Sequence, residues 1–152
     1  MGSMADVYRA PMRSRSDVID PAATLERARR MGLCGFGEPT GTPAEAERLA
    51  RRVDRFAAAA DGSFVWTRDQ DGLFWLGRLD GPYLRDDDDE AVAADLVHVR
   101  PCTWLAEPLL EPEVPAAVTA TFRRGGRNFQ QTHHPSVSQE TQQIWDGRRP
   151  ER

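Results

Sequence analysis

The chain has 152 residues, of which 39% are apolar and 29% charged, and it carries a net charge of −4. This length predicts one domain with a single core. No segment approaches the roughly 18 continuous apolar residues of a membrane helix, and no signal peptide opens the chain. We therefore expect a cytoplasmic protein without membrane contact. Residues 1–4 resemble a cloning remnant, residues 5–147 are expected to form the domain, and residues 148–152 a disordered tail.

The charge is distributed unevenly along the chain. All twenty basic residues are arginines, and much of the acid lies in the run Arg85–Asp95, which we expect to be a solvated loop. Without this run the remaining chain is near neutral, so the overall negative charge does not exclude a local positive face.

The first half predicts two helices and two short strands. An edge strand begins near Val7 and Tyr8. Asp20 caps a helix over Pro21–Met31 that ends at Gly32. A brief strand and a turn follow over Leu33–Pro43. The second helix covers Thr42–Ala60, with Thr42 and Glu45 as a capping box. Its arginines are interpreted as a solvated face: Arg48, Arg51, Arg52 and Arg55.

From Ser63 the hydrophobic period changes to that of strands. Asp71-Gly72 predicts a hairpin whose second strand is Phe74–Leu79. Further strands are expected over Leu96–Leu105, over Ala116–Arg124 and within Arg127–His133, and a helix over Ser136–Gly147. The expected fold class is α+β: a small, curved antiparallel barrel of five or six strands with flanking helices.

No catalytic motif stands out. The two cysteines, Cys34 and Cys102, lack metal-ligand spacing and are expected to be reduced core residues. A hydrolase that pairs one of them with His98 stays open as an alternative, and it requires a lowered thiol pKa. We expect no catalytic residues, no metal and no cofactor.

Large rings and arginines accompany the predicted strands. Aromatic faces stack bases and arginines hold phosphates in nucleic-acid sites. Core filling is the alternative interpretation of each ring.

Two segments resemble a known family. "GRLDGPYLRD" and "DLVHVRPCTWL" are similar to the glycine-aromatic and "HxRxxxW" segments of PUA-like domains of the EVE type, and of related N-terminal domains of some restriction endonucleases. The matching positions are Gly77, Gly81, Tyr83, His98, Val99, Arg100, Pro101, Trp104 and Leu105. "FVWTRDQDGLFWLG" and "GFGE" add weaker similarity, so the resemblance covers about Gly32–Arg124. The chain departs from the family at Asp61–Ser63, where "DGS" stands in place of "GD".

The resemblance implies a PUA/EVE-like barrel that binds nucleic acid and takes a flipped, modified base into an aromatic cage, as EVE-type and YTH-type domains do. It implies a non-catalytic bacterial reader, with DNA favoured over RNA and a methylated cytosine as an example of the base. A role in restriction or defence beside a nuclease or effector partner is implied, as a monomer or weak dimer. The candidate base-binding residues are Phe36, Trp66, Trp75, Tyr83, Trp104 and Asn128. Gln130 is the alternative to Asn128 for hydrogen bonding to the base edge. The candidate phosphate-binding residues are Arg78, Arg100, Arg123, Arg124 and Arg127. The alternative is an interaction module that binds a small molecule or peptide in the same aromatic pocket.

Overall fold

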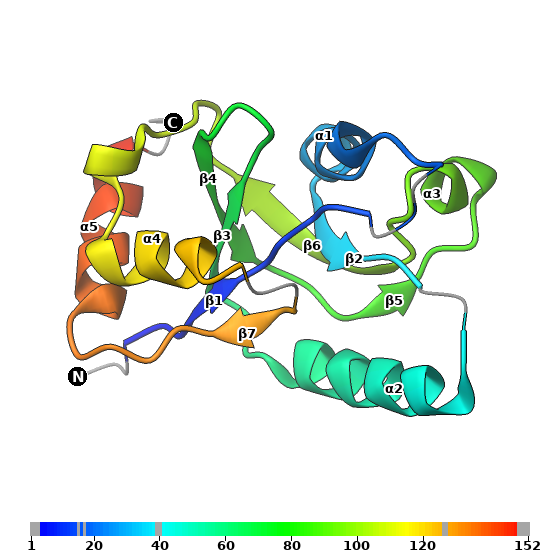
Figure 1. Cartoon of the computed structure of the whole chain (residues 1–152). Helices are drawn as coiled ribbons and strands as arrows, with labels where there is room; N and C mark the ends of the chain where they lie inside the picture. The colour runs from blue at the N-terminus through cyan, green and yellow to red at the C-terminus, as the bar shows by residue number, and fades with distance from the viewer. Residues whose placement is uncertain (1–3, 15, 17, 39–40, 126–127, 149–152) are drawn as a thin grey trace.

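The computed structural model describes residues 4–14, 16, 18–38, 41–125 and 128–148. Within them, seven strands curl into a half-barrel flanked by helices (Figure 1). The strands are β1 (Val7–Arg9), β2 (Leu33–Phe36), β3 (Phe64–Arg68), β4 (Phe74–Leu79), β5 (Leu84–Arg85), β6 (His98–Trp104) and β7 (Gln130–Gln131). The helices are α1 (Pro21–Met31), α2 (Pro43–Ala58), α3 (Asp89–Ala93), a short 3₁₀ turn (Glu111–Glu113), α4 (Ala116–Arg123) and α5 (Val137–Arg148).

The predicted α+β curved barrel is confirmed, with one change in strand direction. The strand order is β2-β6-β4-β3-β1-β7, and β5 pairs with β6. The β1 and β3 strands run parallel, whereas the other pairs are antiparallel. The sheet is therefore mixed, not purely antiparallel as expected.

The curl of the sheet is produced at β6. The first part of this strand pairs with β2 and β5, and its last three residues pair with β4. Gly77 of β4 lies opposite Trp104, and a Cβ atom at Gly77 would lie 2.6 Å from the Cys102 sulfur and 2.7 Å from the indole ring. The side chains of β6 thus pack directly against the β4 backbone, and this close approach requires glycine at position 77.

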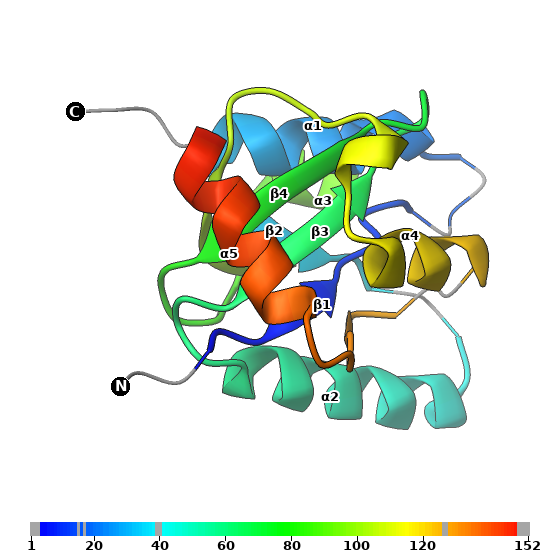
Figure 2. The ribbon, with the colours of Figure 1, turned by 90° about the vertical axis from the view of Figure 1, so that its left-hand side faces the viewer.

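The sheet separates two apolar clusters. The first lies under α1 and the C-terminal turn of α2, and it includes Leu25, Phe56 and Val99. The second lies under α4 and α5 and includes Trp66 and Trp145. Figures 1 and 2 show α4 and α5 on one face of the sheet, α1 on the other, and α2 across the bottom.

Side-chain caps place both predicted helices where expected. The Asp20 carboxylate accepts a hydrogen bond from the Ala22 N–H at 2.9 Å, and Gly32 ends α1 with a φ of 67°. The Thr42 hydroxyl accepts from the Glu45 N–H at 3.2 Å at the start of α2. These bonds satisfy N–H groups that the first helical turn leaves without partners. The C-terminal helix is likewise confirmed, and both cysteines are free and buried as expected.

The predicted strand over Ala116–Arg124 is wrong, because this segment forms α4. Its β-branched residues, which favour strands, are buried along one side of the helix instead. The Thr119 hydroxyl donates to the Ala116 carbonyl at 3.1 Å, which satisfies its polar group within the helix.

The predicted acidic loop is also wrong in part. It contains β5 and the short helix α3, which Asp88 caps by accepting from the Glu90 N–H at 3.1 Å. Acidic residues at a helix N-terminus are favoured by the helix dipole. At the other end of the chain, Arg148 belongs to α5 and not to a tail, and residues 149–152 lie outside the described residues. No helix in the described part of the chain is long and apolar enough to span a membrane.

Candidate functional site

A groove lies between the C-terminal half of α2 and the edge of the sheet formed by β1 and β7. Its volume is about 560 Å³, within the range of roughly 300–1,000 Å³ that small-molecule sites occupy. We call it the α2–β7 groove. Its chemically distinctive lining residues are Tyr8, Arg55, Asn128, Phe129, Gln130, Gln131 and His133. Figure 1 shows α2 below β1 and β7.

Stacked rings form the apolar part of the groove. Tyr8 and Phe129 stack with their centroids 4.6 Å apart and their planes 11° from parallel. Phe56 meets Phe129 edge-on at 4.9 Å and also contacts Phe36 and Tyr83. Burial is the main cause that raises the pKa of Tyr8, so its hydroxyl stays neutral at neutral pH and can donate or accept a hydrogen bond.

Arg9, which is 4% exposed, fixes the rim of the groove. Its guanidinium donates to the carbonyl and hydroxyl of Thr121 at 3.0 and 2.7 Å. It also donates to the Asn128 carbonyl and to the Gln130 side-chain oxygen at 2.8 Å. This residue therefore joins α4 to the segment that carries the groove amides.

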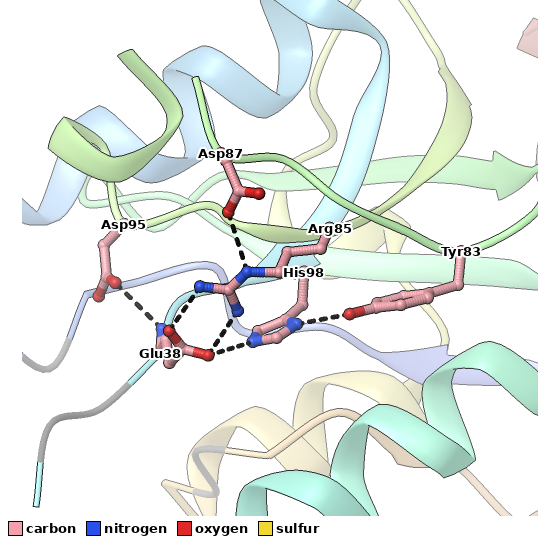
Figure 3. Close-up of polar contacts among 6 residues, drawn as sticks. All are labelled: Glu38, Tyr83, Arg85, Asp87, Asp95 and His98. Atoms are coloured by element: carbon pink, nitrogen blue, oxygen red, sulfur yellow. Dashed lines mark hydrogen bonds and ion pairs between the residues drawn. The ribbon is translucent and has the colours of Figure 1, made fainter. Parts of the chain in front are cut away.

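A second polar assembly lies beside β5 and β6 (Figure 3). The Glu38 carboxylate accepts two hydrogen bonds from Arg85, at 2.6 and 2.9 Å, and contacts His98 Nε2 at 3.2 Å. The other nitrogen of His98, Nδ1, lies 2.8 Å from the Tyr83 hydroxyl. Asp95 accepts from the Glu38 N–H at 3.2 Å. These contacts tie the segment after β2 to β5 and β6.

The titrating groups of this assembly are shifted by their surroundings. The hydrogen bonds from Arg85 are the main cause that lowers the pKa of Glu38, so this carboxyl is ionised at neutral pH. Burial lowers the pKa of His98 and outweighs the attraction of Glu38, so the imidazole is neutral. Asp95 also accepts from the Ser14 hydroxyl at 2.7 Å, so the assembly connects the segment before α1 to the same end of the sheet.

One of the six predicted base-binding residues, Asn128, lines the α2–β7 groove. Phe36 and Tyr83 do not line it. They contact Phe56, which in turn contacts the groove residue Phe129.

The three tryptophans lie elsewhere. Trp104 donates from its indole N–H to the Leu33 carbonyl at 2.9 Å and lines a separate hollow of about 270 Å³ beside α1. Trp75, which is 6% exposed, lies under the Arg29 guanidinium at 3.5 Å. Trp66 is completely buried in the second cluster and donates to the Thr141 hydroxyl at 3.2 Å. The structure therefore does not bring Trp66, Tyr83 and Trp104 together as one cage.

The predicted phosphate-binding arginines are dispersed, and Arg100 is buried. Arg100 donates to the carbonyls of Phe56, Ala59 and Gly81 and pairs with Asp61 at 2.7 Å, so it cannot line a pocket rim in this conformation.

The other four differ in their surroundings. Arg78 donates to the Gly62 carbonyl and lies over the Phe64 ring on the α5 side. Arg123 pairs with Glu111 at 2.8 Å. Arg124 is exposed and contributes to lowering the pKa of Arg9, and Arg127 lies outside the described residues.

Sequence reasoning missed Tyr8, Arg55, Phe129, Gln131 and His133 as groove residues. The available signal was the segment "NFQQTH" (128–133), in which an aromatic side chain stands among four polar ones that carry amides or hydroxyl groups. Its neighbours in the groove, β1 and α2, are far away in sequence. Only the fold brings these three segments together.

No protein-family profile matches the chain, and no curated protein matches it in sequence. Among solved structures, it is similar to the YTH domain of the Zygosaccharomyces rouxii MRB1 protein, determined in complex with N6-methyladenosine RNA. The identity is 12% and the TM-score 0.50, over 99% of this chain and 88% of that chain. A structural-genomics protein from Agrobacterium tumefaciens also matches, with 11% identity and a TM-score of 0.42 over 91% of this chain and 92% of that chain. The first similarity is one of fold: this chain shares the curved half-barrel architecture of that YTH domain.

Proposed function

We propose that this domain binds nucleic acid and recognises a modified base in the α2–β7 groove. The observation that carries the proposal is the composition of that groove, which combines a stacked ring pair, three side-chain amides, an arginine and a histidine. Rings stack on a base, amides donate to and accept from its edge, and cations attract phosphate. The solved YTH domain of similar fold, which was determined with methylated RNA, supports the same class of ligand.

The recognition chemistry follows from the two parts of the groove. A methyl group on a base adds apolar surface that can be buried against Tyr8 and Phe129. One methylene in an apolar pocket contributes about 1–3 kcal/mol of discrimination. The amides of Asn128 and Gln131 would then distinguish one base edge from another.

We further propose that the domain has no catalytic activity of its own. Burial raises the pKa of the Cys34 thiol to about 12, so the thiolate that a hydrolase needs is not formed at neutral pH. His98 is held by Tyr83 and Glu38 and is paired with Phe36 in the β2–β6 register, while Cys34 is paired with Arg100. Both observations favour a binding domain over a cysteine hydrolase.

The finer expectations belong to the same proposal. Membership of the EVE type, DNA over RNA, a methylated cytosine, base flipping and a nuclease or effector partner are drawn from the resemblance of β4–β6 to that family. A panel of oligonucleotides tests the preferred polymer and the preferred base directly, because the two probes of each pair differ in one feature.

The experiment measures fluorescence polarisation with labelled octamers of DNA and RNA at 50 and 200 mM salt. The central base is plain or methylated cytosine, or plain or N6-methylated adenine. We expect one methylated octamer to bind at least about tenfold more tightly than its plain counterpart. Asn128→Ala and Gln131→Ala should weaken this preference, while Gln143→Ala on the exposed side of α5 should not.

Three outcomes would count against the proposal. No binding of any octamer at 50 mM salt would refute it. Binding that salt does not weaken would favour the small-molecule or peptide alternative, because phosphate contacts release counterions. Loss of the preference on Trp104→Ala, with the two groove variants unchanged, would move the site to the hollow beside α1.

A further inference from the structure

Some arginines in the described part of the chain pair with carboxylates, whereas three on α2 do not. Several arginines form ion pairs with Asp or Glu: Arg27, Arg85, Arg100, Arg123 and Arg148. Arg48, Arg51 and Arg55 are exposed, and none of them makes an ion pair or hydrogen bond with the part of the chain that the structure describes. Their guanidinium groups are therefore accessible to an anionic ligand.

These residues form a row beside the groove. Arg48, Arg51 and Arg55 recur at the i, i+3, i+7 spacing that places residues on one face of a helix. Two arginines fix the direction of that face. Arg55 lines the groove, and Arg52 Nη1 donates to the Asn128 side-chain oxygen at 3.3 Å on its rim. At about 1.5 Å per residue, the row extends roughly 10 Å along α2 away from the groove.

The packing of α2 leaves this row accessible. Phe56 is the buried residue of the helix, and it anchors the C-terminal turn in the aromatic cluster. The residues from Pro43 to Asp54 are exposed or only partly buried. The C-terminal turn of α2 is therefore fixed beside the groove, and the preceding turns expose their arginines to solvent.

We propose that the α2 arginine row holds the sugar-phosphate backbone on one side of the nucleotide bound in the groove, so that the ligand is a strand of several nucleotides and not a free nucleoside. This inference rests on the proposed function. A cation row that continues one end of a base-sized groove offers phosphates a path, and two or three contacts fit its length.

The test uses the methylated octamer that the wild-type protein binds best, together with its free modified nucleoside. The triple variant Arg48→Gln/Arg51→Gln/Arg55→Gln is compared with the control Arg13→Gln/Arg68→Gln/Arg148→Gln, which changes the net charge by the same amount. In the α2 variant we expect the octamer affinity to fall about tenfold at 50 mM salt. The slope of log K against log salt should become shallower by about 1.4–2.1, or about 0.7 per lost phosphate contact to a single strand. Nucleoside affinity, measured by calorimetry, should not change.

The outcomes separate this inference from the proposed function. If the wild type binds no octamer, the proposed function fails and the inference fails with it. If the wild type binds but the α2 variant keeps both its affinity and its salt slope, the inference alone is overturned. An equal loss in the control variant also overturns it, because the effect would then arise from net charge and not from the row.

Discussion

At the scale of single residues, Arg100 shows how a motif residue can serve the fold. It stands in the "HVRP" segment, where the family resemblance suggested a phosphate contact. In the structure its guanidinium caps the C-terminal carbonyls of α2 and pairs with Asp61. A cation at a helix C-terminus is favoured by the helix dipole, and here it also attaches α2 to β6.

Replacing Arg100 should therefore lower stability. Arg100→Gln leaves the carbonyls of Phe56, Ala59 and Gly81 without their shared donor, and each buried acceptor left unsatisfied costs about 1–3 kcal/mol. Asp61→Asn should cost about 1 kcal/mol or less, because Asp61 is largely exposed and the carbonyl contacts remain. Urea unfolding measures both values. A change below about 1 kcal/mol for Arg100→Gln would contradict the capping role.

His98 should make stability depend on pH. Its pKa is lower in the folded chain than in the unfolded chain, because burial disfavours the charged ring more than Glu38 favours it, with Arg85 and Arg52 opposing the charge. As the pH falls below about 6.5, the unfolded chain binds a proton that the folded chain does not. The free energy of unfolding should thus decrease, by at most about 1.4 kcal/mol per pH unit, and level off below the folded pKa.

The measurement is urea unfolding at pH 7.5, 6.5 and 5.5 for the wild type and for His98→Gln. The variant should lack this decrease. Glu38 does not interfere in this range, because its own lowered pKa confines its effect to more acidic conditions. Parallel pH profiles of the two proteins would show that His98 is not the titrating group.

At the scale of elements, local signals were sufficient where a cap or a turn fixed the answer. Asp20, Thr42 and the Asp71-Gly72 turn placed two helices and a hairpin correctly, since their hydrogen bonds lie within a few residues. The prediction for the α4 segment was wrong because its β-branched residues favour a strand. In the folded chain these residues are buried on one side of a helix, and this packing outweighs their strand preference. Most residues of the α2–β7 groove could not be predicted from the sequence for a related reason. Its parts come from β1, α2 and the segment 128–133, and no local pattern states that they meet.

For the arginines of α2, the sequence predicted the exposure of the side chains but not their surroundings. The sequence correctly placed Arg48, Arg51 and Arg55 on an exposed helix face. Their lack of acidic partners within the described chain, and the position of Arg55 in a groove, depend on the contacts of the whole fold. An exposed arginine can be interpreted as a candidate binding residue only when the ion pairs of the surrounding structure are known.

At the scale of the whole molecule, the two apolar clusters share one sheet, so we expect them to unfold together. Trp145 of α5, 7% exposed, contacts Phe64 at a centroid distance of 5.8 Å in the second cluster. Trp145→Ala should cost about 3–5 kcal/mol, a large part of the 5–15 kcal/mol that such domains possess. Because β3 and β4 carry residues of both clusters, the loss should reach β2 and β6 on the far side of the sheet.

Native-state hydrogen exchange measures this extent. The slowest amides of β2 and β6 should lose protection by the same free energy as those of β3, as they do when exchange requires global unfolding. Ile144→Ala serves as the matched control, because Ile144 neighbours Trp145 on α5 but is only partly buried, so its smaller cost should be distributed in the same way. If Trp145→Ala lowered protection in β3 and α4 alone, the helices α4 and α5 would form a separately unfolding layer. The groove, whose rim Arg9 joins to α4 through Thr121, would then depend on that layer instead of on the half-barrel.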